Sequence, residues 1–73
     1  MHRYQIQLVT TKDIREFVET VSQIDCKVTL CDGNAFRVNA KSILGAMASI
    51  EWSTLYCDAE EPIYSKIERF CIT

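Results

Sequence analysis

The sequence predicts an α+β fold in which a four-stranded antiparallel sheet carries helices on one face, in the order βαββαβα. Several segments alternate apolar and polar residues, as strands buried on one side do. Between them, apolar residues recur at helical spacing. The 73 residues are 48% hydrophobic, enough for one small core. Amphipathic strands of this kind need cover on one face only, which favours an open-faced sandwich and a single domain over residues 1–73.

The first strand and helix are the most clearly patterned part of the chain. The segment YQIQLV, residues 4–9, alternates apolar and glutamine side chains. Thr10 or Thr11 is expected to cap the helix that follows, with Asp13 in its first turn, where a negative charge favours the helix dipole. The helix should run to about Gln23. Its predicted buried stripe is Ile14, Phe17, Val18 and Val21.

A hairpin is expected next. The segment CKVTLC, residues 26–31, alternates again, with its odd-numbered positions facing outward. The string DGN, residues 32–34, predicts the turn, because glycine and asparagine accept a positive φ. The returning strand should bury Phe36 and Val38.

A short helix from Ser42 to about Ser49 precedes the last strand, STLYCD, residues 53–58. We expect Leu55 and Cys57 to face inward and Tyr56 outward, although the opposite parity is left open. After the acidic turn AEEP, Pro62 is predicted to occupy the first position of a third helix. The residues expected on its buried face are Ile63, Ile67, Phe70 and Cys71.

Composition excludes several classes of function. The net charge is −2 and the basic residues are scattered, so the usual footprint of a nucleic-acid-binding protein is missing. No apolar run approaches the ~20 residues of a membrane span. The first residues do not resemble an export signal, so we expect a cytoplasmic protein that binds neither nucleic acid nor membrane.

Four cysteines and one histidine give little sign of a metal centre. No CxxC pair is present, and His2 lies at the start of the chain. We expect Cys26, Cys31, Cys57 and Cys71 to be reduced thiols that act mainly as small hydrophobic side chains. The sequence implies no metal and no cofactor.

Two strings carry a resemblance to a known family. VNAKSILGAM, residues 38–47, resembles the regulatory-serine segment of HPr, the small phosphocarrier of the bacterial sugar phosphotransferase system, and of its relative Crh. VSQIDCKVTL, residues 21–30, is similar to the passage from the first helix to the second strand in that family. The resemblance covers nearly the whole chain and implies the HPr-like open-faced sandwich.

The carrier histidine of that family has no counterpart here. Alignment back from residues 21–30 places its position at Thr10, the family's arginine at Lys12 and the following proline at Asp13. A threonine does not form the labile phosphoramidate needed to pass phosphate on, and Asp13 would repel a phosphate. We therefore expect no catalytic residue and no histidine phosphotransfer.

A second family site maps onto Ser42. In proteins of this family that serine is phosphorylated by a dedicated kinase, and the phosphoprotein then binds a transcriptional regulator. The resemblance also implies that Ile43, Leu44 and Met47, with Lys12, contact partner proteins. The structural alternatives are that Ser42 is only a helix cap and that the three apolar residues face the core.

The resemblance predicts protein partners: the serine kinase, phosphotransferase enzymes or a regulator. The alternative is a plain interaction domain, with a homodimer left open. An enzyme has the least support, because no nucleophile and base can be paired from the sequence. Glu60 and Glu61 are expected in a solvated turn, Cys31 and Tyr56 on the open face of the sheet, and Trp52 at the edge of the core.

Overall fold

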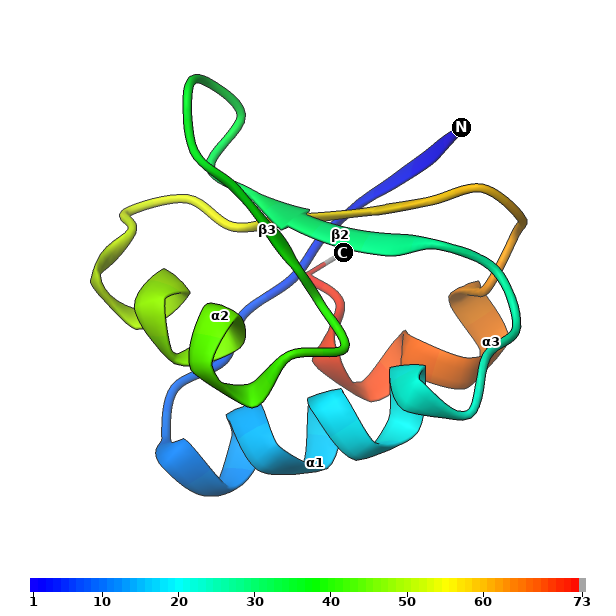
Figure 1. Cartoon of the computed structure of the whole chain (residues 1–73), viewed down its shortest axis with the longest axis horizontal. Helices are drawn as coiled ribbons and strands as arrows, with labels where there is room; N and C mark the ends of the chain where they lie inside the picture. The colour runs from blue at the N-terminus through cyan, green and yellow to red at the C-terminus, as the bar shows by residue number, and fades with distance from the viewer. Residues whose placement is uncertain (73) are drawn as a thin grey trace.

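The computed structural model describes residues 1–72, and Thr73 lies outside the described part. A four-stranded antiparallel sheet in the order β1-β4-β2-β3 carries the helices on one face (Figure 1). The strands are β1 (His2–Gln5), β2 (Val28–Cys31), β3 (Arg37–Asn39) and β4 (Tyr56–Ala59). The helices are α1 (Thr11–Ser22), α2 (Ile43–Ala48) and α3 (Tyr64–Ile67), with 3-10 turns η1 (Ser49–Glu51) and η2 (Glu68–Phe70). The predicted fold class and element order are confirmed.

The register of the sheet separates an inner face from an outer one. Cys57 of β4 lies opposite Tyr4 on one side and Leu30 on the other. Cross-strand partners point to the same side of a sheet, so these residues share the face that the helices cover. Leu55 and Cys57 are buried, which confirms the expected parity of the last strand.

β1 begins earlier and ends earlier than the sequence predicts. Beyond Gln5, the one ladder contact among the described residues is an isolated bridge from Ile6 to Cys71. The N–H of Gln7 donates to the carbonyl of Phe70 at 2.9 Å. The C-terminal turn thus takes the backbone groups that a longer β1 would need, although Ile6 and Leu8 are buried as expected.

α1 matches its prediction closely. Thr10 is the N-cap, and its hydroxyl accepts from the N–H of Asp13 at 3.1 Å. The predicted stripe is buried, and Phe17 meets Phe70 edge to face with ring centroids 5.2 Å apart. α1 is therefore the helix that closes the core.

The start of β3 was also predicted wrongly. Phe36 was expected inside but is 61% exposed, because the loop after β2 delays the start of β3 to Arg37. The carboxylate of Asp32 accepts from the N–H groups of Asn34 and Phe36, at 2.8 and 3.2 Å, which holds this wider loop. Only Gly33 has a positive φ there, 83°. Phe36 instead stacks on the half-buried Trp52, with ring centroids 6.1 Å apart.

Pro62 does not start the third helix. α3 begins at Tyr64, because the N–H of Ile63 donates to the Tyr4 hydroxyl at 3.1 Å and Ile63 has a non-helical φ of −126°. After one turn the chain continues as η2. The predicted buried face is otherwise present, with Ile63, Ile67 and Phe70 buried and Cys71 partly exposed.

Cys26 and Cys57 belong to the hydrophobic core and Cys71 packs against it, whereas Cys31 is buried on the other face of the sheet. Cys26, Cys31 and Cys57 are buried free thiols. Burial raises the pKa of the Cys57 thiol to about 12, so this group is protonated near neutral pH. Among residues 1–72, no helix is long and apolar enough to cross a bilayer.

Candidate functional site

The N-terminus of α2 is built on Ser42. Its backbone is extended, with φ −100° and ψ 121°, and its hydroxyl accepts from the N–H of Gly45 at 3.3 Å. The Ser42 carbonyl accepts from Ala46 at 2.8 Å and starts the helical ladder. No acidic residue lies in the first turn of this helix. Ser42 is thus a helix N-cap, and the residue is half-buried.

The inner side of α2 consists of small residues. Ala46 is fully buried, and a side chain at Gly45 would meet Val38 and the carbonyl of Asn39, each at 3.3 Å. The helix therefore lies close on β3. Because the contact between α2 and β3 is made by small residues, the larger apolar residues of α2 lie on other sides of the helix.

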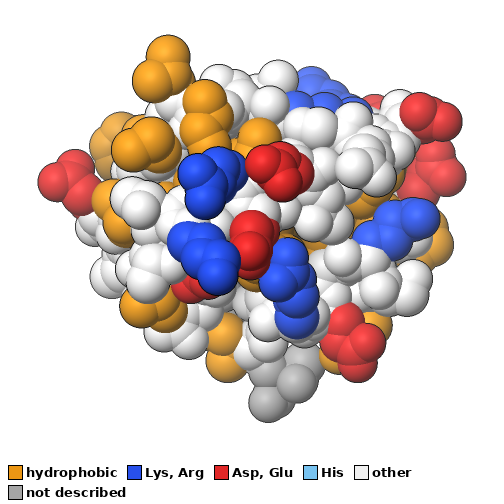
Figure 2. Space-filling view, turned by 90° about the horizontal axis from the view of Figure 1, so that it is seen from below, with side chains coloured by type: hydrophobic (Ala, Val, Ile, Leu, Met, Phe, Trp, Pro, Cys, Tyr) orange, Lys and Arg blue, Asp and Glu red, His pale blue; other side chains and the backbone are white. Residues whose placement is uncertain are grey.

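An exposed apolar surface results, which we call the α2 patch. Ile43, Leu44, Met47 and Ile50 are exposed by 42%, 80%, 45% and 46%. Residues 43, 47 and 50 follow one stripe along α2 and into η1. Figure 2 views the molecule from the side on which α1 lies and shows hydrophobic side chains gathered at its upper left, toward α2.

The sequence places three members of the patch correctly on α2, but their role as partner contacts stays a prediction. Ile50 was missed because the helix was expected to end at Ser49. The spacing of seven residues from Ile43 is the signal that identifies it. The exposed Phe36, stacked on Trp52, was also missed. The exposure of the Phe36 ring follows from the geometry of the loop and not from the sequence pattern.

The N-terminus of α1 has a different construction. The Asp13 carboxylate accepts from the N–H groups of Val9 and Thr10, at 3.0 and 3.2 Å. These two hydrogen bonds hold the pKa of Asp13 below its usual value. Together with the Thr10 hydroxyl they form a capping box. Lys12 is exposed on the first turn, and His2 lies on β1, paired with Ala59.

The outer face of the sheet carries an ion cluster that the sequence did not reveal. Asp58 is 2% exposed and accepts two hydrogen bonds from Arg3, at 2.7 and 2.9 Å, and one from Arg37 at 3.2 Å. The hydrogen bond from Arg3 is the main reason that the pKa of Asp58 lies below its usual value. Alternate residues of a strand share a face, so the parity that predicted an outward Tyr56 also predicts an outward Asp58. The sequence therefore contained a signal for the position of Asp58, although not for its partners.

Cys31 lies under this cluster. Its thiol is 3.7 Å from Asp58 Oδ2 and 3.6 Å from an Arg3 nitrogen, and the residue is 1% exposed. Cys31 and Tyr56 are on the outer face as expected, but Cys31 is covered by the arginine. It is therefore not itself a contact surface.

The described residues show little that would support acid/base or metal chemistry. Within residues 1–72, no three histidine, cysteine or acidic residues are grouped as a metal site would need. A Glu60 carboxylate oxygen accepts from the N–H of Lys27 at 3.0 Å and so holds the start of β2. Thr10, Ser42 and their helices bring hydroxyls, not a nucleophile paired with a base, to the surface.

Comparison with known proteins identifies the fold and nothing further. No protein-family model matches the chain, and no match is found among curated proteins. Among solved structures, the crystal structure of HPr-C-His from Thermoanaerobacter tengcongensis is similar, with a TM-score of 0.71 and 22% sequence identity. The similarity covers 93% of this chain and 84% of that one. The protein therefore has an HPr-like fold.

Proposed function

We propose that this protein is a regulatory adaptor that docks onto other proteins through the α2 patch, with Ser42 as the residue whose phosphorylation controls docking. It is not a histidine phosphocarrier. The observation that supports this most directly is the α2 patch itself. Four large apolar side chains are exposed on and next to a six-residue helix whose inward side is only Ala46 and Gly45.

The exposure of the patch favours a partner. Apolar side chains of this size gain about 1.5–3 kcal/mol each on full burial. Folding leaves 42–80% of the surface of each of these four residues exposed, and a partner could bury that remainder. Exposed apolar residues that lie next to one another mark interaction surfaces more often than scattered ones do. The Phe36 ring stacked on Trp52 adds a rigid aromatic group of the kind enriched in protein interfaces.

Ser42 is well placed to change that surface by phosphorylation. A phosphate on the N-cap faces unpaired helix N–H groups, and the first turn of α2 has no carboxylate to repel it. It adds nearly two negative charges directly beside Ile43. The modified protein would present an anion and an apolar stripe together, which a partner with arginine and apolar side chains would recognise.

Thr10 does not support the carrier activity of the proteins that the chain resembles. Its hydroxyl is used by the capping box, and Asp13 already occupies the N–H groups of Val9 and Thr10. A phosphate there would compete with a carboxylate for the same donors. The imidazole that carries phosphate in HPr has no equivalent at this end of α1.

A second candidate is a homodimer in which the α2 patch meets its own copy and Ser42 is only a cap. The hydrogen bond from Gly45 to the Ser42 hydroxyl favours the capping role of Ser42, because a residue that caps a helix needs no further role. The patch would then bury itself by two-fold symmetry.

The test uses the purified chain in two reactions read by intact mass. One contains phosphoenolpyruvate and the general phosphotransferase enzyme, and the other contains ATP and the HPr serine kinase. We expect one phosphate to be added by the kinase only, and none to Ser42→Ala. Thr11→Ala is the matched control, since it removes a hydroxyl near the other helix N-terminus without removing its cap.

Transfer from phosphoenolpyruvate would contradict the claim that the carrier function is absent. No addition by the kinase would remove Ser42 as the switch. A dimer in sedimentation that Met47→Lys dissociates would then establish the second candidate.

A further inference from the structure

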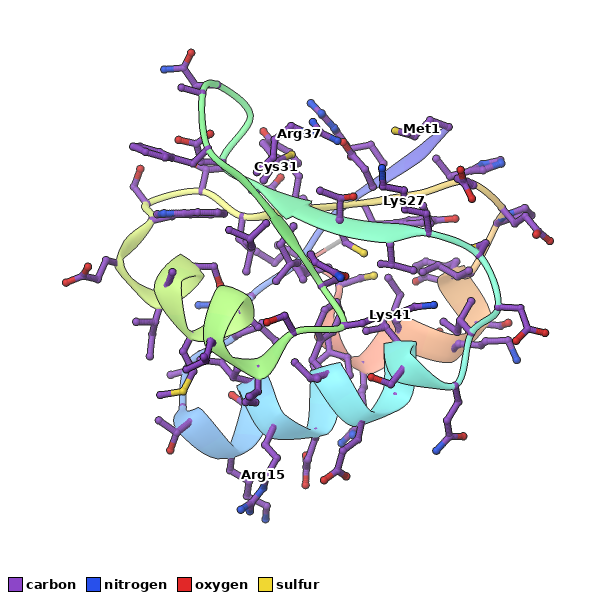
Figure 3. The ribbon with its side chains drawn as sticks, in the orientation of Figure 1. Met1, Arg15, Lys27, Cys31, Arg37 and Lys41 are labelled. Atoms are coloured by element: carbon purple, nitrogen blue, oxygen red, sulfur yellow. The ribbon has the colours of Figure 1, made fainter. Side chains whose placement is uncertain are left out.

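The outer face of the sheet holds a hollow that the α2 proposal does not use. It has a volume of about 420 Å³. It lies where β2 begins, next to Lys27, and where β3 ends, at Asn39. Thr29 and Asn39 are paired in the ladder, so both project from the same face. Figure 3 shows Lys27 and Arg37 on the side of the sheet away from α1. The hollow and the α2 patch are therefore separate surfaces.

The lining of this hollow is positively charged. Lys27, Arg37 and Lys41 line it, three of the eight basic residues in a chain of net charge −2. None of the described residues that line it is acidic. The groove along α1, by contrast, mixes Glu16 and Glu19 with its basic residues. The hollow is thus a local concentration of positive charge on a chain that is acidic overall.

Most of the hydrogen-bond donors of Arg37 are not used within the protein. It gives one N–H to Asp58 at 3.2 Å, whereas Arg3 binds the same carboxylate twice, at 2.7 and 2.9 Å. The two arginines and one aspartate leave a surplus of one positive charge. A guanidinium carries five N–H donors, so most of those on Arg37 are free for a ligand.

The neighbouring side chains add further donors. Lys27 forms no ion pair with a carboxylate among residues 1–72, and its contact with Glu60 uses only its backbone N–H. Asn39 accepts from the N–H of Lys41 through its side-chain oxygen at 2.9 Å, which leaves its amide N–H groups free. The Lys41 ammonium already donates one hydrogen bond to the carbonyl of Ile24, so we expect it to contribute mainly its charge.

We propose that this hollow binds a small phosphate monoester. The forked Arg37 and the point charge of Lys27 match a phosphate dianion, which Thr29 and Asn39 would complete with neutral hydrogen bonds. Met1 supplies an exposed apolar side chain for the organic part of the ester. The volume lies within the range of roughly 300–1,000 Å³ found for small-molecule sites.

The test follows backbone amide signals of the full chain by NMR during titration with phenyl phosphate at low salt. We expect saturable shifts centred on residues 27–29 and 37–39, with a dissociation constant on the order of 1 mM. Inorganic phosphate, which lacks the apolar part, and phenylacetate, which has one charge, are expected to bind more weakly.

Lys27→Gln is the informative variant, because that ammonium has no structural partner among the described residues. We expect it to weaken binding by about threefold to tenfold. Lys66→Gln removes the same charge on α3, away from the hollow, and should leave binding of phenyl phosphate unchanged. Shifts that do not saturate, shifts centred on α2, an unchanged affinity in Lys27→Gln, or equal binding of inorganic phosphate would each overturn the proposal. None of these results bears on Ser42.

Discussion

α1 and α2 lie side by side under the same sheet, but they use their apolar residues in opposite ways (Figure 1). α1 buries its whole apolar stripe, with Phe17 fully enclosed. α2 buries only Ala46 and leaves its large apolar side chains at the surface. The difference indicates that α1 contributes mainly to the stability of the fold, whereas α2 is fixed by small residues and is free to contact other molecules.

The same contrast holds at the helix N-termini. Both begin with a hydroxyl residue, Thr10 or Ser42, that accepts from the N–H three positions on. At α1 a carboxylate completes the cap, while the first turn of α2 has none. One N-terminus already has its anion, and the other can receive one.

The largest effect that would sharpen the comparison is on stability. Phe17→Ala is expected to lower the free energy of unfolding by ~3–5 kcal/mol, because a ring enclosed by the core leaves a cavity. Urea unfolding followed by circular dichroism measures it. If Leu44→Ala costs as much, the assignment of α1 to the fold and α2 to the surface is wrong.

The caps should differ by less. Thr10→Ala is expected to lower the free energy of unfolding by about 1 kcal/mol, since it opens a reciprocal capping box on a long, packed helix. Ser42→Ala should cost about 0.5 kcal/mol, because its hydrogen bond is long and the helix short. The same unfolding measurement applies. Equal losses would show that α2 depends on its cap as much as α1 does.

Acid should act on the α1 cap and not on that of α2. The pKa of Asp13 is lowered by hydrogen bonds from Val9 and Thr10, so its stabilising contribution is complete above its ordinary pKa of about 4 and is lost as pH falls through the lower folded value. Stability measured from pH about 7 to about 2 should therefore decline less in Asp13→Asn than in the native chain. The remaining decline is assigned in part to Asp58, whose pKa is lowered by Arg3. An identical pH profile in both proteins would contradict the cap.

The smallest effect on stability is expected at the α2 patch. Met47→Ser should change the free energy of unfolding by less than about 0.5 kcal/mol, because Met47 is 45% exposed and lies outside the hydrophobic core. Binding of any α2 partner should fall in the same variant, measured by calorimetry. A large loss of stability would place Met47 in the core and remove the basis of the docking proposal.

The sequence predicts well those features that depend on local periodicity. The stripe of α1 follows from spacing alone and is confirmed. The inward parity of Cys57 was the preferred one of two that the spacing allowed, and it is also confirmed. Phe36 was placed wrongly, because the five-residue loop closed by Asp32 shifts the start of β3. Alternation predicts which residues share a face, but not the residue at which a strand begins.

The ion cluster on the outer face could not be predicted from the sequence, for a different reason. Arg3, Arg37 and Asp58 come from three strands, and their meeting depends on the order β1-β4-β2-β3. The hydrophobic pattern of single strands does not determine that order. Ser42, in contrast, was found from its own short segment, because an N-cap is a local feature.

The central claim is that the N-terminus of α2 accommodates a phosphate and that of α1 does not. The most direct measurement is the melting temperature of chemically synthesised chains carrying phosphoserine at position 42 or phosphothreonine at position 10. We expect phosphoserine 42 to melt at or above the unmodified chain. Phosphothreonine 10 should melt several degrees lower, since about 1 kcal/mol corresponds to roughly 4–8 °C in a protein of this size. Equal tolerance at both positions, or a lower melting temperature for the chain modified at Ser42 alone, would contradict the claim.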